Sequence, residues 1–186
     1  MYKHALIGAC LLFAASAQAQ GIGEKSGVNS LLGVSPSTQD FVTEAAMGDM
    51  LEIESGKLAQ QQASDPKLKQ FANQLMTDHQ KTTDELKALV ESGKVRVNLP
   101  TTMNKSQQSK LDKLKSLSGA NFDNEFDDMQ RSAHKDATSL FERYVKGGEN
   151  NDLKAFASKH LPTLQHHLKM AEDLKSNTST QGRGNR

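Results

Sequence analysis

Four long stretches of the chain place apolar residues three and four positions apart, with polar residues between them. Because an α-helix has about 3.6 residues per turn, this spacing puts the apolar side chains on one face of a helix. The second stretch follows Asp65 and Pro66, and an aspartate cap before a proline is a typical helix start. The pattern predicts helices over residues 39–63, 68–90, 122–145 and 153–174.

The link between the second and third predicted helices, residues 95–120, is long for neighbours in a bundle. Its leucines at Leu111, Leu114 and Leu117 predict a short helix over 105–118, which would span about 21 Å. Such a link can return the chain along the length of a bundle. The sequence therefore predicts an all-α fold, a ferritin-like antiparallel four-helix bundle. It consists of two helical hairpins joined by a long crossover that contains a short extra helix.

Two of the predicted helices carry unusual residues on their inner faces. The inner strip of the first is mostly small, which would let a neighbouring helix approach closely, and Glu52 is its exception. The fourth contains Pro162, which removes one backbone hydrogen bond and usually bends a helix. The strip of the first helix consists of Phe41, Ala45, Gly48, Glu52, Ser55 and Ala59.

Residues 1–19 have the pattern of a cleaved export signal. A basic start is followed by the apolar run 5–13 and by small residues that fit cleavage after Ala19. The run is too short to anchor the chain in a bilayer. A lipoprotein signal ending at Cys10 is the alternative, but the apolar run continues beyond this cysteine. The sequence thus predicts a periplasmic protein that is cleaved after Ala19.

The rest of the chain forms one predicted domain with two polar ends. Residues 20–37 are rich in Gly and Ser and read as a flexible linker, and 176–186 read as a disordered tail. Between them, residues 38–175 hold all the predicted helices. This length is sufficient for one hydrophobic core.

Cleavage changes the charge and the cysteine count. Removing Lys3 leaves 22 of the 23 basic residues against 22 acidic ones, and removing Cys10 leaves no cysteine. A neutral chain lacks the positive charge typical of nucleic-acid binding proteins. We expect a protein or small molecule as partner, no nucleic acid, no transmembrane segment in the mature chain, and a monomer or dimer. Peripheral association with the outer membrane is a further hypothesis.

The sequence contains no familiar catalytic motif. A Gly-rich phosphate loop, a nucleophile elbow and a His-Glu-x-x-His pair are all absent from it. Asp123, Asp127 and Asp128 lie at the start of the third predicted helix, where their charge complements the helix dipole. We therefore predict no catalytic residues and favour a non-enzymatic role.

Histidines on or beside the apolar faces are the candidate chemistry. Imidazole and carboxylate ligands suit iron, zinc, manganese or copper. Ferritin-like di-metal sites use Glu-x-x-His pairs, yet Met76, Arg131 and Leu164 stand three residues before the histidines here, which argues against oxidase or ferroxidase chemistry. The candidate metal ligands are Glu52, His79, His134 and His167, with His160 nearby.

The simpler interpretation of these histidines is structural. A neutral imidazole can lie in a core if carbonyls or carboxylates satisfy its nitrogens, and Glu52 could be partly exposed or paired with a histidine. His166 points away from the apolar face and is expected in solvent. Met170 near His166 suggests copper, but the methionines mostly fit core packing. The favoured function is a non-enzymatic binding or envelope and stress accessory module, and binding of iron, copper or zinc is the alternative.

The order and spacing of several segments resemble a known bacterial family. They are the run 52–59, Phe71-Ala72 with Asp78-His79, Phe122-Asp123, His134, and the run 161–168. Over residues 40–175 they are similar to the family called domain of unknown function 4142 (DUF4142). The resemblance implies an exported, ferritin-like helical bundle, and it implies no biochemical role.

Overall fold

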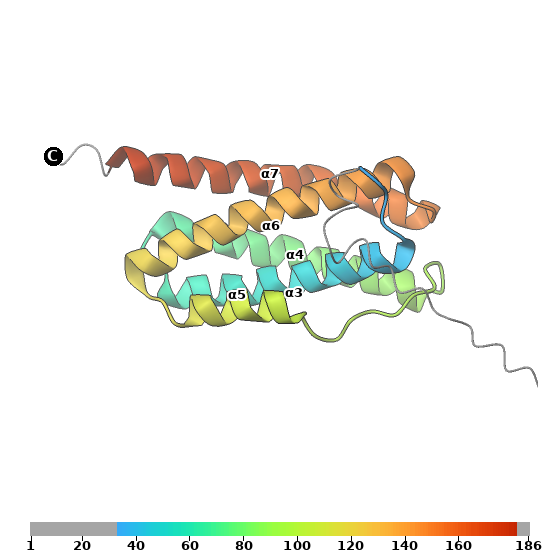
Figure 1. The fold of residues 1–186 in the computed structure, drawn as a ribbon, viewed down its shortest axis with the longest axis horizontal. Coiled ribbons are helices and arrows are strands. Elements are labelled where there is room, and N and C mark those ends of the chain that lie inside the picture. Colours follow the sequence, from blue (N-terminus) through green and yellow to red (C-terminus); the bar gives the residue numbers. More distant parts are fainter. Residues whose placement is uncertain (1–32, 182–186) are drawn as a thin grey trace, which may run out of the picture.

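The computed structural model describes residues 33–181, with side chains up to Leu174. This part of the chain is helical and contains no strand, which confirms the all-α fold (Figure 1). None of its helices is long and apolar enough to cross a membrane. The helices are α3 (Thr38–Gln62), α4 (Pro66–Glu91), α5 (Lys105–Lys115), α6 (Gly119–Gly147) and α7 (Asn151–Gln181).

Two antiparallel hairpins form the bundle. α3 packs along α4, and α6 packs along α7. The link after α4 returns along the bundle and carries α5 on the outside of α3, so that α4 and α6 run in the same direction (Figure 1). This is the predicted ferritin-like plan with a long crossover. α5 begins at Lys105, as expected, and its leucines Leu111 and Leu114 are buried.

Local sequence signals set the helix ends. The Ser37 side chain accepts a hydrogen bond from the Asp40 amide at the start of α3, and Asp65 accepts one from the Lys67 amide at the start of α4. Asn104 and Gln107 form a reciprocal capping box that starts α5. α7 continues through Pro162 to Gln181, so the helix enters the segment 176–186 for which the sequence predicts disorder.

Asp123 does more than begin a helix. Its carboxylate accepts hydrogen bonds from the Ser64 amide at 2.9 Å and the Asp65 amide at 3.1 Å, and also from the Ser64 hydroxyl. The interpretation of Asp123 as helix-starting charge is therefore incomplete, because this side chain fastens the turn between α3 and α4 to the beginning of α6. Spacing along one helix could not reveal a partner in a distant turn.

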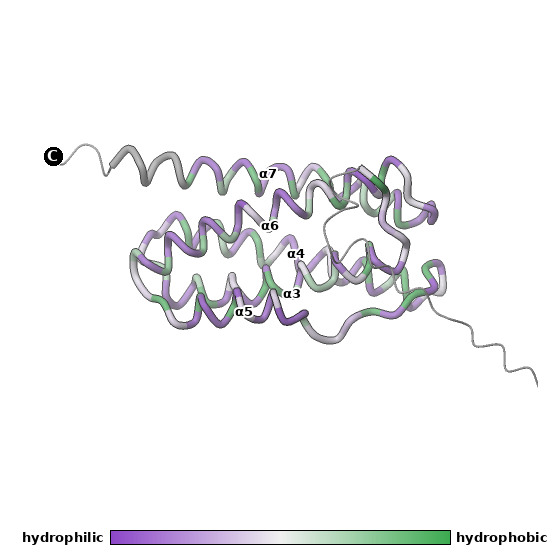
Figure 2. The backbone as a smooth tube through the Cα atoms, viewed as in Figure 1, coloured by the Kyte–Doolittle hydropathy of each residue, from purple (hydrophilic) through white to green (hydrophobic). Residues whose placement is uncertain are grey.

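Hydrophobic and hydrophilic residues alternate along the helices (Figure 2), and the buried hydrophobic residues form two apolar clusters. One surrounds Phe41, Phe141 and Tyr144, and the other surrounds Phe71, Phe122 and Phe126. On each long helix, a buried polar residue lies between its contributions to the two clusters: Asp49, His79, His134 and His167. We call these four residues, together with the buried Glu52, the polar layer.

A glycine sets the close packing of α3 on α4. A Cβ atom at Gly56 would lie 2.6 Å from Met76 Cγ and 3.2 Å from the Ala72 carbonyl oxygen. Any larger residue would therefore push the two helices apart. The close approach expected from the small residues of α3 is observed, although Gly56 lies beside the predicted strip.

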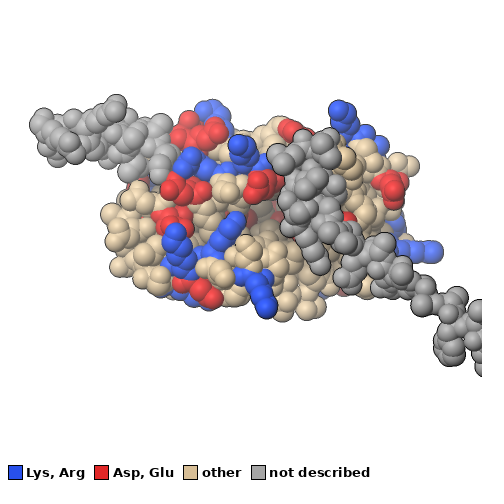
Figure 3. Space-filling model, viewed as in Figure 1, with Lys and Arg blue, Asp and Glu red and all other residues tan. Residues whose placement is uncertain are grey.

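Charges of both signs are interspersed over α5, α6 and α7 on the face seen in Figure 3. Lys113 on α5 pairs with Glu125 on α6 at 2.6 Å. Exposed pairs of this kind contribute up to about 1 kcal/mol. They help to position α5 but do not determine the fold.

The predicted export signal 1–19 lies outside the described residues, as does most of the linker 20–37. Cleavage after Ala19 and periplasmic location therefore stay predictions. The described helices begin at Thr38.

Candidate metal centre

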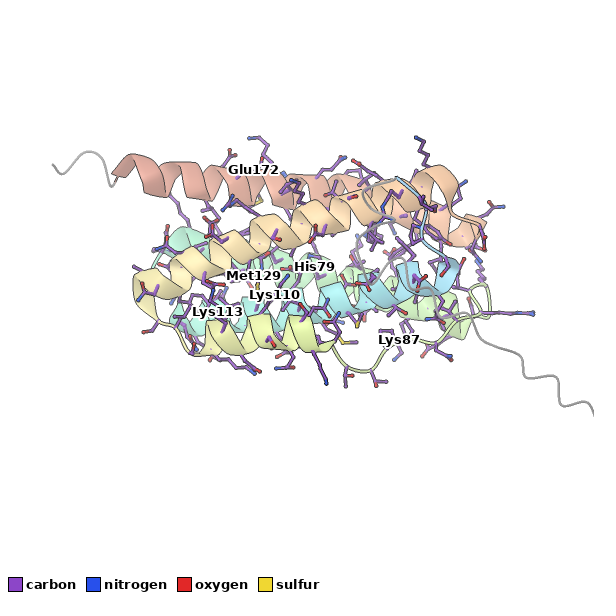
Figure 4. All side chains as sticks on the ribbon, in the orientation of Figure 1. His79, Lys87, Lys110, Lys113, Met129 and Glu172 are labelled. Carbon is purple, nitrogen blue, oxygen red and sulfur yellow. The ribbon has the colours of Figure 1, made fainter. Side chains whose placement is uncertain are left out.

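Three of the four predicted ligands meet in the polar layer. His79 of α4, His134 of α6 and His167 of α7 each offer one ligand atom, and these atoms lie within 4.8 Å of one another. The ring centroids are 5.2–5.6 Å apart. All three residues are buried, with 4%, 1% and 1% of their surface exposed. Figure 4 shows His79 inside the bundle, about halfway along its length.

His79 and His134 are each anchored through Nδ1. His79 Nδ1 donates to Asp49 Oδ1 at 2.8 Å, and Thr83 donates to the other oxygen of Asp49 at 3.2 Å. His134 Nδ1 lies 2.9 Å from the Gln130 carbonyl oxygen, which can only accept, so this nitrogen carries the proton. The Nε2 atoms of the two histidines face each other at 3.4 Å. Two lone pairs at this distance repel, and a cation between them, either a proton or a metal ion, removes the repulsion.

His167 is anchored through its other nitrogen. Its Nε2 donates to Asp78 Oδ2 at 2.9 Å, and Gln74 donates to the same oxygen at 2.7 Å. His167 Nδ1 is buried and has no hydrogen-bond partner among the described residues. A neutral His167 therefore points an unused lone pair into the interior.

The surroundings shift the pKa values in opposite directions. Burial would lower the pKa of His79, but the hydrogen bond and charge of Asp49 outweigh burial and raise it. Burial and the charge of His79 lower the pKa of His134, against the charge of Glu52. Burial, followed by the charges of His134 and His79, lowers the pKa of His167 to about 4. One proton on His79 therefore bridges to a neutral His134, while His167 stays neutral.

The pKa values of the two carboxylates that bond the histidines are shifted in opposite directions. Burial raises the pKa of Asp49 against its bond to His79, and we assign the shared proton to His79 because both Asp49 oxygens accept hydrogen bonds. Burial raises the pKa of Asp78 too, but the bonds from Gln74 and His167 outweigh it and lower that pKa. Both carboxylates thus act as acceptors that orient imidazoles.

Glu52 lies beside the three histidines. It is 3% exposed, and it lines the same cavity as His79 and His134. Its Oε2 atom is buried without a hydrogen-bond partner among the described residues. The structure thus brings this predicted residue to the wall of the same cavity, outside the group of ligand atoms that His79, His134 and His167 form.

His160 and His166 do not join the cluster. His160 is buried, but Nε2 bonds Glu85 at 2.8 Å and Nδ1 lies 3.5 Å from the Thr82 hydroxyl. The Thr82 hydroxyl donates to the Asp78 carbonyl oxygen at 3.0 Å, so the bond of Nε2 to Glu85 is what holds His160, apart from the three histidines. His166 is exposed, and Met129 packs in the apolar cluster that surrounds Phe71, Phe122 and Phe126.

The cluster has the chemistry of a metal site. An ion about 2.0–2.1 Å from two nitrogens holds them roughly 3.4 Å apart in tetrahedral geometry, which the His79–His134 pair already matches. The third nitrogen would need to approach by no more than about 1.5 Å. Metal-bound histidines commonly donate their other N–H to a carboxylate or a carbonyl, and all three do so here.

The family comparison agrees with the fold. Residues 24–174 match the family described as Domain of unknown function (DUF4142). The chain belongs to this family. No curated protein matches the sequence.

Two solved structures share the fold of this DUF4142 protein. One is CopM in the Cu(II)-bound form, with a TM-score of 0.65 and 19% identity, over 77% of this chain and 99% of that chain. The other is CopM in the Cu(I)-bound form, with a TM-score of 0.63 and 19% identity, over 77% of this chain and 98% of that chain. At this identity the likeness establishes the helical fold.

Sequence reasoning missed the residues that orient the histidines. Asp49 and Asp78 are aspartates within helices, where a carboxylate normally lies in solvent, and Gln130 contributes only its backbone carbonyl. One signal was available for Asp49, which lies three residues before Glu52 and so shares its side of α3. No sequence signal distinguishes a carbonyl that receives an imidazole proton.

Proposed function

We propose that this protein is an exported metal-binding bundle that holds one divalent transition-metal ion through His79, His134 and His167. The observation that carries the proposal is the arrangement of the imidazole nitrogens. Each histidine is anchored through one nitrogen, and the other nitrogen is directed into a shared, buried space. Glu52 would supply an oxygen ligand.

The unused nitrogens favour this function over the structural interpretation. A histidine kept only for packing is expected to find a partner for each of its nitrogens. His167 Nδ1 has no partner among the described residues, and the facing nitrogens of His79 and His134 require a cation between them. A metal ion in place of the bridging proton would bind one nitrogen of each of the three histidines. This places metal binding ahead of the partner-binding role that the sequence favours.

Copper(II) is the ion we expect to bind most tightly. Nitrogen sites generally prefer Cu²⁺ among the divalent first-row metals, and imidazole suits copper, zinc, iron and nickel. The two solved structures that share the fold are described as copper-bound forms of CopM, which supports the same choice. When bound, the ion would act as a cargo or a structural centre, because the chain offers no catalytic motif.

Metal titration of the purified protein tests this function. The protein is prepared without a histidine tag, stripped with a chelator and titrated with Cu²⁺ and Zn²⁺ in competition with a chromophoric chelator. We expect one tight equivalent, with Cu²⁺ bound more tightly. His134→Ala should lose far more affinity than the roughly 10–100-fold typical of an outer-sphere change. Circular dichroism confirms that each variant is folded.

His160→Ala is the matched control, because it removes another buried histidine from the same bundle. It should bind like the original protein. A protein that takes up no metal, or a His134→Ala variant that binds like His160→Ala, would end this proposal.

Export is the second part of the proposal, and it rests on the sequence of residues 1–19. Expression in a Gram-negative bacterium and osmotic release should yield a periplasmic protein whose first residue is Gln20. Recovery of the uncleaved chain in the cytoplasm would refute the export proposal and leave the metal-binding proposal unchanged.

A further inference from the structure

We infer that the cavity between α3, α6 and the start of α5 is the route by which a metal ion reaches the histidines, and that Gly48 keeps this route open. The inference rests on the proposed metal function. It concerns how the ion enters and leaves rather than which atoms hold it.

The cavity ends at the proposed metal centre. It has a volume of about 440 Å³, and its walls include His79, His134 and Glu52. Its outer part is lined by residues of α5, among them the exposed Lys110. A second hollow, between α4 and α7, is lined by Glu85 and Phe156 and includes none of the three histidines.

The other sides of the cluster are closed by packing. Phe71 lies against His134 and His167 with ring centroids 6.5 and 6.3 Å away. Asp78 covers the outer nitrogen of His167. Along the axis of the bundle, the two apolar clusters fill the interior on either side of the polar layer. An ion that approaches through this cavity therefore meets His79 and His134 without displacing a core side chain.

The charge of the walls suits a cation. Four carboxylates line the cavity, against Lys110, Arg143 and the protonated His79. A cleft lined by an excess of one sign attracts ions of the opposite sign. The unpartnered Oε2 atom of Glu52 lies at the inner end, where it can accept a cation before the imidazoles do. The four carboxylates are Glu44, Asp49, Glu52 and Asp136.

Gly48 is the unexpected residue in this wall. A glycine inside a helix destabilises it by roughly 0.5–1 kcal/mol relative to alanine. Packing does not demand it, because a Cβ atom at Gly48 would meet nothing within 4 Å, in contrast to Gly56. Gly48 lies one helical turn before Glu52, on the same side of α3. A side chain at this position would project into the space that leads to Glu52.

Stopped-flow kinetics test the route with Gly48→Leu. The apo protein is mixed with Cu²⁺ to measure uptake, and the loaded protein is mixed with excess chelator to measure release. We expect both rates to fall at least tenfold, with the equilibrium affinity unchanged within about threefold, because an obstruction slows passage in both directions. Ala133→Leu adds the same bulk from the α6 wall and should act in the same way.

Two controls separate obstruction from general disturbance. Gly48→Ala, which adds a single methyl group, should slow both rates far less than Gly48→Leu and should raise stability. Ala155→Leu, which adds bulk to the hollow between α4 and α7, should leave both rates unchanged. Unchanged rates in Gly48→Leu and Ala133→Leu, or a loss of affinity that parallels the loss of rate, would overturn the inference. Neither result affects the metal proposal, which the equilibrium titrations of the original protein and of His134→Ala test separately.

Discussion

At the residue scale, the three central histidines differ in how their protons are held. Asp49 stabilises the charged form of His79, whereas burial keeps His134 and His167 neutral. Metal ligands must be neutral imidazoles, so His134 and His167 are already prepared to bind. His79 must give up its bridging proton, and the strength of the site therefore depends on Asp49.

Asp49→Asn should weaken copper binding by roughly 10–100-fold. The amide oxygen of asparagine can still accept a hydrogen bond from His79 Nδ1. The negative charge of Asp49, which makes His79 a stronger ligand for the metal ion, is lost. Competition titration measures the change. Asp84→Asn, an exposed change on the same helix as His79, is the control and should leave the affinity as it was. Equal affinities in the two variants would show that Asp49 does not support the site.

The apo protein should lose stability in acid. The pKa of His167 is lowered to about 4 in the folded state and is about 6.5 in the unfolded chain. The stabilisation from keeping this histidine neutral is thus complete above about pH 6.5 and is lost as the pH falls towards 4. The loss is on the order of 3 kcal/mol. The lowered pKa of His134 acts in the same direction, whereas the raised pKa of His79 favours folding at low pH.

Urea unfolding of the apo protein between pH 7 and 4 measures this dependence. His167→Gln retains a donor for Asp78 but cannot be protonated, so its free energy of unfolding should fall less steeply with acid. An identical slope in the variant would refute the assignment of His167 as a buried, neutral group.

At the scale of elements, a contact between the α3–α4 turn and the start of α6 stabilises the bundle in addition to the packing of the helices. Asp123 of α6 accepts hydrogen bonds from the turn that connects α3 to α4. Removal of the Asp123 carboxylate would leave the backbone amides of Ser64 and Asp65 without this hydrogen-bond acceptor. This side chain therefore couples the two hairpins at one end of the bundle.

Asp123→Ala should lower the free energy of unfolding by about 1–3 kcal/mol and leave copper affinity unchanged. Urea denaturation and the copper titration provide the two readings. Asp128→Ala removes an exposed carboxylate of the same helix that pairs with Arg131, and should cost less than about 1 kcal/mol. If the two variants are equally stable, Asp123 does not tie the hairpins together.

The positions of the helices and their topology could be predicted from the sequence. The level of each residue along the axis of the bundle could not. Apolar spacing determines which face of a helix is buried, and it placed His160 and His167 on one face of α7. These two residues are seven apart, about 10.5 Å along the axis, so only one of them can reach the level of His79. Which one does so depends on how the helices slide against each other. That register also decides which carboxylates face the imidazoles, so Asp49 and Asp78 were not identified.

At the scale of the whole molecule, the polar layer divides the core into two apolar clusters. Burying carboxylates and imidazoles is unfavourable unless they are paired, and replacing such groups with apolar residues often stabilises a protein. The bundle keeps this layer at mid-length, where it is connected to the surface through the α3–α6 cavity. A bound ion would pair the remaining lone pairs and join the two halves of the core.

A crystal structure of the protein loaded with one equivalent of copper, with anomalous data at the copper edge, tests the central claim most directly. The account predicts one strong anomalous peak in the polar layer, about 2.0 Å from one nitrogen each of His79, His134 and His167. A copper peak at another position, such as the exposed His166, with no ion at the three histidines, would contradict this prediction.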